Sequence, residues 1–127
     1  MKLAKIVFYA AGIWGLPVIA IGYFTESYVA RKYPPAVNHP EYFYGFMGVA
    51  LAWQVAFLII AQDPIRYRPL MLPSMLEKLG YGVALVLLYS LGRINRGVFL
   101  FGCQDWIFLA AFIAAYAATR KRTSQQT

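Results

Sequence analysis

The sequence is poor in charge. Only 13% of its 127 residues are Asp, Glu, Lys or Arg, whereas 61% are hydrophobic. A soluble domain usually has about a quarter of its residues charged, and the mean hydropathy of this chain is high, at +0.54. So few charges cannot coat a water-facing surface, and a disordered chain needs the opposite composition. The composition therefore indicates a small integral membrane protein.

Cysteine and histidine are almost absent. Cys103 is the single cysteine, so the chain has no intrachain disulfide and no CxxC redox pair. His39 is the single histidine, which excludes a bis-histidine haem and a histidine-rich metal site within one chain. No GxSxG, HExxH or glycine-rich phosphate loop is present. We therefore predict no metal and no other cofactor, and an enzyme is the least favoured functional class.

Four apolar runs are long enough to cross a bilayer, which takes about 20 helical residues. The expected helices cover residues 6–24, 44–61, 73–92 and 98–118. The last two are joined by a very short loop, so they must be antiparallel neighbours. The sequence thus predicts an all-α fold, a four-helix transmembrane bundle running up-down-up-down. This single domain spans residues 1–127 and ends in a polar cytoplasmic tail at 119–127.

The formal net charge of +7 comes from basic residues at the ends of the apolar runs. This placement favours anionic lipid headgroups over nucleic acid as partners. Cytoplasmic segments of membrane proteins carry an excess of Lys and Arg. The side with both termini holds Lys2, Lys5, Arg66, Arg68, Lys78, Arg120, Lys121 and Arg122; the other holds Arg31, Lys32, Arg93 and Arg96. We expect both termini in the cytoplasm, and the compact size suggests a bacterial inner membrane.

A compact basic turn, Asp63–Pro69, connects the second and third expected helices. Asp63 can stabilise such a turn by accepting hydrogen bonds from the backbone that follows it. Arg66 and Arg68 are expected to bind lipid phosphates or, alternatively, to dock a cytoplasmic partner protein.

Asp105 is the main candidate for a functional residue. It lies about 10 Å along the last expected helix, where an ionisable group is costly and marks a functional site by default. We expect its carboxylate to point into the bundle and to pair with Arg93, Arg96 or Gln54. The alternative is a structural role, in which Asp105 fixes the register of the helices. Lys78, near the start of its helix, is expected to extend to the membrane surface.

Gln54 lies near the middle of the second expected helix, where an amide without a partner would be costly. We expect it to pair with Asp105, Gln104 or Ser90. Gln54, Gln104 and Asp105 would then supply the few polar contacts that a lipophilic pocket needs. Trp14 and Trp106 would line this pocket. The expected ligand is a hydrophobic or amphiphilic small molecule such as a lipid, a quinone or a terpenoid.

The alternative function is a structural or accessory subunit of a larger membrane complex. Small residues recur at a spacing of four in each expected helix, which lets neighbouring helices approach closely. The stripes are Ala11 and Gly15; Gly48, Ala52 and Ala56; Gly80 and Ala84; and Ala110, Ala114 and Ala118. They predict close packing within the bundle or, on one stripe, a homodimer face or a docking face.

Glu26 closes the first expected helix and a proline-containing loop follows it. The next helix opens on Tyr42-Phe43-Tyr44 and carries Trp53-Gln54-Val55-Ala56-Phe57. With the number of spans, these features resemble small membrane proteins of the EXPERA-like and DoxX-like kind. In EXPERA-like proteins, acids inside the bundle face a cavity for sterol-like or cationic amphiphilic ligands. DoxX-like proteins are associated with quinone-linked redox complexes. The resemblance implies a lipophilic ligand or a membrane-protein partner.

Overall fold

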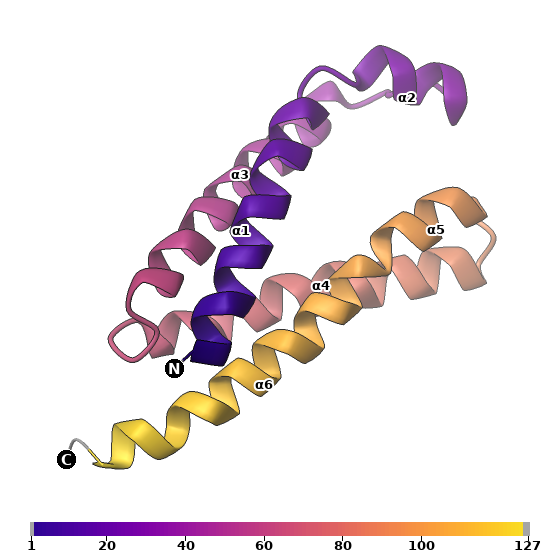
Figure 1. Cartoon of the computed structure of the whole chain (residues 1–127). Coiled ribbons are helices and arrows are strands. Elements are labelled where there is room, and N and C mark those ends of the chain that lie inside the picture. The colour runs from indigo at the N-terminus through magenta and orange to yellow at the C-terminus, as the bar shows by residue number, and fades with distance from the viewer. Residues whose placement is uncertain (1, 126–127) are drawn as a thin grey trace.

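The computed structural model describes residues 2–125, and their side chains as far as residue 120. Every regular element within this part of the chain is helical (Figure 1), which confirms the all-α prediction. The elements are α1 (Lys2–Gly22), α2 (Glu26–Lys32), α3 (Pro40–Gln62), the 3-10 turn η1 (Arg68–Leu70), α4 (Met71–Ser90), α5 (Arg96–Gly102) and α6 (Gln104–Gln125).

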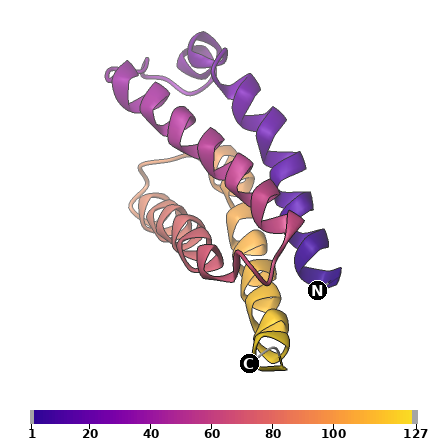
Figure 2. The ribbon, with the colours of Figure 1, turned by 90° about the vertical axis from the view of Figure 1, so that its left-hand side faces the viewer.

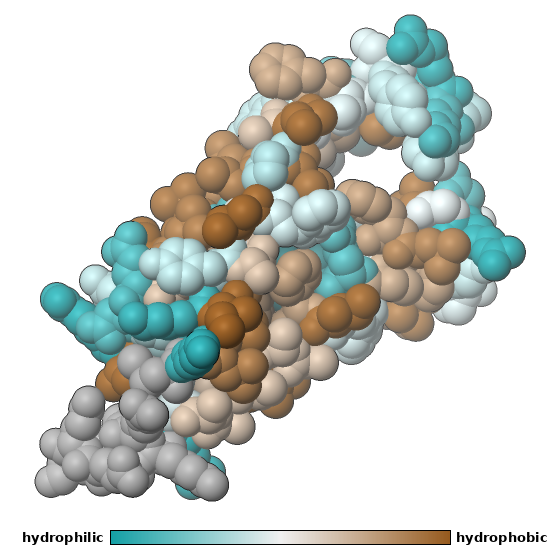
Figure 3. Space-filling view, in the orientation of Figure 1, coloured by the Kyte–Doolittle hydropathy of each residue, from teal (hydrophilic) through white to brown (hydrophobic). Residues whose placement is uncertain are grey.

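Four stretches are long and apolar enough to cross a membrane, as predicted. They are Lys2–Gly22, Pro40–Gln62, Arg68–Ser90 and Arg96–Arg120. Only 22–28% of the most apolar part of each stretch is buried inside the molecule. Large hydrophobic side chains therefore cover much of the surface, and hydrophilic ones gather towards the ends (Figure 3).

Several helices extend beyond the apolar runs that predicted them. α3 begins at Pro40, since proline suits the first position of a helix. The predicted tail at 119–127 is helical as far as Gln125, because its Arg, Lys and Gln residues are good helix formers; residues 126–127 lie outside the described residues. Hydropathy locates the ends of the apolar run, and the helix continues into the polar residues beyond it.

The helices associate in two pairs (Figures 1 and 2). The first pair is α1 and α3. The second is α4 together with the segment formed by α5 and α6. α1 also packs on α6, and this contact joins the two pairs. The two pairs diverge towards the end of the molecule that holds α2 and α5, which we call the α2–α5 end (Figure 1).

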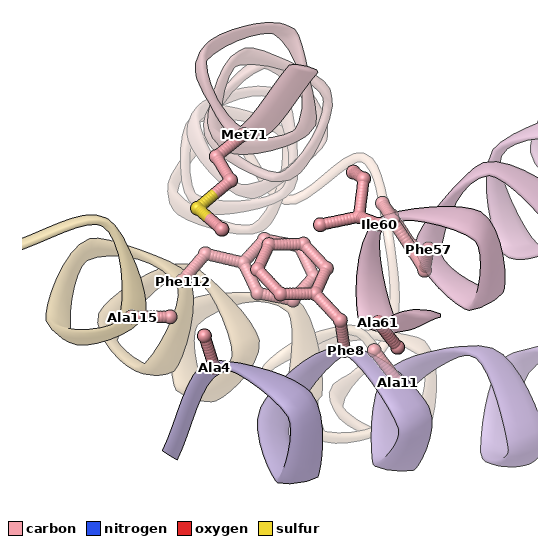
Figure 4. Close-up of a cluster of buried hydrophobic side chains, with 9 residues drawn as sticks. All are labelled: Ala4, Phe8, Ala11, Phe57, Ile60, Ala61, Met71, Phe112 and Ala115. Atoms are coloured by element: carbon pink, nitrogen blue, oxygen red, sulfur yellow. The ribbon is translucent and has the colours of Figure 1, made fainter. Parts of the chain in front are cut away.

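The hydrophobic core lies where the two pairs meet, away from the α2–α5 end (Figure 4). The rings of Phe8 and Phe112 stack with centroids 4.4 Å apart, and Phe57 meets Phe112 edge-on at 5.0 Å. Such aromatic pairs contribute about 0.5–1.5 kcal/mol beyond the burial of their area. The cluster is completed by Ala4, Ala11, Ile60, Ala61, Met71 and Ala115. Residues from all four long helices thus meet around one aromatic trio.

We predict that Phe112→Ala lowers the free energy of unfolding by about 3–5 kcal/mol, because the fully buried ring leaves a cavity where four helices meet. Unfolding of the purified protein in mixed micelles, followed by circular dichroism, measures the effect. Ile113→Ala is the matched control, since Ile113 is 53% exposed, and its expected loss is below about 1 kcal/mol. Equal losses in both variants would contradict the assignment of the core.

Candidate functional site

Lys78 lies near the middle of the long apolar stretch Arg68–Ser90 and is buried, with only 7% of its surface exposed. The prediction that it extends to the membrane surface was wrong, because α4 begins at Met71 and Lys78 lies about 10 Å along the helix. The buried residues of α4 are Met71, Ser74, Lys78, Gly82 and Leu85. They recur every three or four positions and so share one helix face. In the sequence this face is marked by the small or polar residues Ser74, Lys78 and Gly82 among apolar neighbours, which is the signal that places Lys78 inside the bundle.

The ammonium of Lys78 is surrounded by two carboxylates and two aromatic rings. Its Nζ lies 3.2 Å from Asp105 Oδ1 and 3.5 Å from Glu77 Oε2. It also lies 5.4 Å from the centroid of the Phe57 ring and 5.7 Å from that of Phe108. A cation taken out of water needs such partners, because opposite charges and ring faces replace part of its lost hydration. Phe57 thereby links the charged site to the aromatic core.

The partners predicted for Asp105 were therefore wrong. Arg93 and Arg96 are exposed near the turn between α4 and α5, and the carboxylate of Asp105 bonds the α4 lysine instead. The partners predicted for Gln54 were wrong as well. Its Nε2 donates a hydrogen bond of 2.9 Å to the carbonyl of Ala50, one turn earlier in α3. An amide can meet its need for a partner within its own helix, so its depth in the helix does not require a partner on another helix.

A break between α5 and α6 places Asp105 in the first turn of α6. Gly102 lets α5 lie close against α4, since a Cβ at this position would come within 2.5 Å of Leu85 Cδ2. The N-terminal end of a helix carries the positive end of its dipole, which stabilises a carboxylate there. The sequence predicted one continuous helix over 98–118, because the apolar run is not interrupted at Gly102 and Cys103.

A small hollow of about 50 Å³ lies beside the ion pair. Its polar lining comes from all four long helices: Trp14 of α1, Gln54 of α3, Lys78 of α4, and Gln104 and Asp105 of α6. Trp14 Nε1 donates a hydrogen bond of 2.7 Å to Gln104 Oε1 across the pairs of helices. These five residues define the polar hollow.

The remainder of the polar hollow is mostly apolar. Val18 and Ile19 of α1 and Phe108 of α6 contribute to its wall. Gly15 makes room for the amide of Gln54, because a Cβ at position 15 would collide with Gln54 Oε1. Sites for drug-sized ligands usually measure about 300–1,000 Å³. The polar hollow therefore suits the polar end of a molecule or a few waters, and it does not enclose a whole quinone or terpenoid.

Four of the five predicted ligand residues line the polar hollow, and Trp106 does not. The Trp106 ring packs against α4 at Gly82, where a Cβ would lie 2.8 Å from Trp106 Cε2. Its buried indole N–H has no hydrogen-bond partner among the described residues. Nor do any three His, Cys, Asp or Glu side chains within that part of the chain come together as metal ligands.

Arg68 packs against α6, at the end of the molecule opposite α2 and α5. Its Nε donates to Thr119 Oγ1 at 3.0 Å, its Nη2 donates to the Tyr116 carbonyl at 3.1 Å, and its guanidinium lies 3.7 Å from the Tyr116 ring centroid. The Asp63 turn forms as predicted, with Asp63 Oδ1 accepting from the Arg66 backbone N–H at 3.2 Å. Arg68 thus joins the α3–α4 connection to α6, and the exposed Arg66 is better placed for lipid phosphates.

Comparison with protein-family models, curated proteins and solved structures finds no match to this chain. The resemblance to EXPERA-like and DoxX-like proteins therefore rests on the sequence features alone.

We predict that Lys78→Met lowers the free energy of unfolding by about 3–5 kcal/mol, because it leaves the Asp105 carboxylate buried without its counter-ion. Adding Asp105→Asn to this variant should restore part of the loss, since one of the two carboxylates left without the ammonium is then neutral while Glu77 keeps its charge. A double-mutant cycle on unfolding in mixed micelles measures the coupling of the two side chains.

Lys5→Met is the matched control for this cycle. It makes the same chemical change at an exposed position of α1 and should alter stability by no more than about 0.5 kcal/mol. Additive losses for Lys78→Met and Asp105→Asn would show that the two charges do not stabilise each other.

Proposed function

We propose that the chain is an integral membrane protein that binds the polar end of an amphiphilic small molecule in the polar hollow. One observation carries the proposal: polar side chains from four separate apolar helices converge beside a buried ion pair near the middle of the spans. Ionisable groups at such a depth are costly and indicate function by default.

The chemistry of the polar hollow defines the head of the ligand. The Lys78 ammonium and the Gln104 amide are donors, while the Asp105 carboxylate and the Gln54 carbonyl oxygen are acceptors. This mixture suits a small neutral group such as a hydroxyl or a carbonyl, as in a quinone, a terpenoid alcohol or a lipid glycerol. The apolar remainder of the ligand would leave the hollow past Val18 and Ile19 of its wall and lie along the lipid-facing surface.

The topology belongs to the same proposal. We infer an up-down-up-down path with both termini in the cytoplasm of a bacterial inner membrane. The bias of Lys and Arg towards the side of the termini supports it, and this bias keeps its sign when the buried Lys78 is no longer counted among the surface cations.

A second candidate function is an accessory subunit of a membrane complex. The Ala11–Gly15 stripe packs within the chain, against α3. Gly80 and Ala84 of α4 are exposed, and a Cβ at Gly80 would meet no atom within 4 Å. This face leaves room for a further helix to approach closely. Co-purification of a stoichiometric partner after mild solubilisation would favour this function over the first.

We predict saturable quenching of Trp14 fluorescence by a decyl-substituted benzoquinone, because Trp14 lines the polar hollow. The protein background is Trp53→Phe with Trp106→Phe, which leaves Trp14 as the single tryptophan. In this background Asp105→Asn and Gln104→Leu should each weaken binding about tenfold. The first replaces a charged acceptor with a neutral amide, and the second removes an amide that faces the ligand head.

The control is Gln62→Leu, which makes the same change as Gln104→Leu at an exposed position at the end of α3. Its quenching curve should match that of the parent. A linear quenching curve in the parent, which reports partition into the micelle, would refute a defined site. So would saturable binding that neither Asp105→Asn nor Gln104→Leu alters.

A further inference from the structure

A second and larger cavity lies at the α2–α5 end, where the two pairs of helices diverge. It has a volume of about 460 Å³, within the range of small-molecule sites. One wall is formed by Tyr33, Pro34 and Pro35 of the connection after α2, and the other includes Arg93, Asn95 and Val98. Figure 3 shows an opening at this end of the molecule, with hydrophilic side chains on its outer side. We call this cavity the outer groove.

A tightly defined turn holds Arg93 at the outer groove. α4 ends at Ser90, and Gly92, two residues later, is in the left-handed conformation at φ +70°. The Arg93 N–H then donates to the Leu88 carbonyl at 2.8 Å, and the Gly92 N–H donates to the Tyr89 carbonyl at 3.0 Å. These two bonds form a Schellman motif, which fixes the direction of the chain after a helix. The Arg93 backbone is thus anchored directly beside the cavity.

The outer groove offers donors to a ligand and no carboxylate. Arg93 and the hydroxyl of Tyr33 supply donors. Asn95 Oδ1 accepts from the Val98 backbone N–H at 2.9 Å, which fixes the side chain and leaves its amide N–H groups available. No ion pair of Arg93 is found among residues 2–120.

The acids at this end of the molecule are held elsewhere. Glu26 Oε2 accepts from the Tyr44 hydroxyl at 2.7 Å, and Glu41 lies 3.1 Å from His39 Nδ1. Neither carboxylate lines the outer groove. The local charge is therefore positive, and it favours an anion.

Further cations flank the outer groove. Arg31 and Lys32 lie in the last turn of α2, and Arg96 begins α5. Lys32 Nζ donates to the Tyr28 hydroxyl at 2.9 Å and lies 5.7 Å from the Tyr33 ring centroid. The hydrogen bond with Tyr28 raises the pKa of Lys32 above its ordinary value.

The depth of the outer groove matches a lipid headgroup if the spans cross a membrane as proposed above. The third span ends at Ser90 and the fourth begins at Arg96, so the turn between them lies at the boundary of the apolar layer. Exposed apolar side chains lie close by in the sequence, because Leu91, which precedes Gly92, is 69% exposed and Leu100 of α5 is 56% exposed. A ligand with its phosphate in the cavity and its acyl chains along these residues would match both the cationic cavity and the apolar surface near it.

We propose that the outer groove binds the phosphate of an anionic phospholipid, with Arg93 as its main contact. A guanidinium presents two parallel N–H groups to phosphate oxygens, which gives a stronger and more directional contact than a single charge. Asn95 and Tyr33 add neutral hydrogen bonds. This site is distinct from the polar hollow, whose lining it does not share.

Native mass spectrometry of the full chain in detergent, titrated with phosphatidylglycerol, tests the proposal. We expect one tightly retained lipid and about a tenfold loss of affinity for Arg93→Gln, because a charge-assisted contact is lost. Lys5→Gln removes the same charge near the chain's N-terminus and should leave the affinity unchanged. Val98→Trp narrows the groove without changing its charge and should also weaken retention.

Equal weakening by Arg93→Gln and Lys5→Gln would overturn the proposal, since it would report diffuse surface charge. Retention unchanged in both Arg93→Gln and Val98→Trp would overturn it too. Excess inorganic phosphate as a competitor distinguishes a site for a phospholipid from a site for free phosphate. Lipid retained in its presence supports a phospholipid site, whereas full displacement would overturn the lipid assignment. Trp14 quenching reads the polar hollow separately, so failure of one site is distinguishable from failure of the other.

Discussion

The buried charge of Lys78 is the constraint on which the centre of this structure depends. An ammonium inside an apolar bundle loses its hydration, and only opposite charge and oriented polar or aromatic groups can replace that hydration. Asp105, Glu77, Phe57 and Phe108 do so from three helices. Because each of these partners must lie within a few ångströms of one atom, the ion pair fixes how α3, α4 and α6 stand relative to each other.

The helices pack tightly at one end of the molecule and progressively less tightly towards the α2–α5 end. At one end the aromatic trio of Phe8, Phe57 and Phe112 closes the contact between the pairs of helices. In the middle, the polar hollow lies beside the ion pair, and at the α2–α5 end the pairs diverge around the outer groove. Tight packing, a small polar site and a larger cationic site therefore follow one another, and the two proposed sites differ in size and in charge.

Glycines allow the close approaches that this arrangement requires. Gly82 admits the Trp106 ring against α4, and Gly102 admits Leu85 against α5. Both contacts draw α4 and the α5–α6 segment together, which brings the Lys78 ammonium to the carboxylate at the start of α6. Gly92 ends α4 through a positive φ and directs the chain into α5. The absence of a side chain thus determines where the charged side chains meet.

The sequence by itself determined the helical class, the four stretches long and apolar enough to cross a membrane, and most of the polar residues that line the polar hollow. These follow from composition and run length, because a bilayer demands long apolar helices and makes every polar exception conspicuous. Which exceptions meet was decided by the tertiary structure. Asp105 bonds Lys78, and Gln54 bonds its own helix, because helix rotation, the earlier start of α4 and the break before α6 set those distances. The length and mean hydropathy of a run carry no information on helix rotation, and an uninterrupted apolar run does not reveal where a helix breaks.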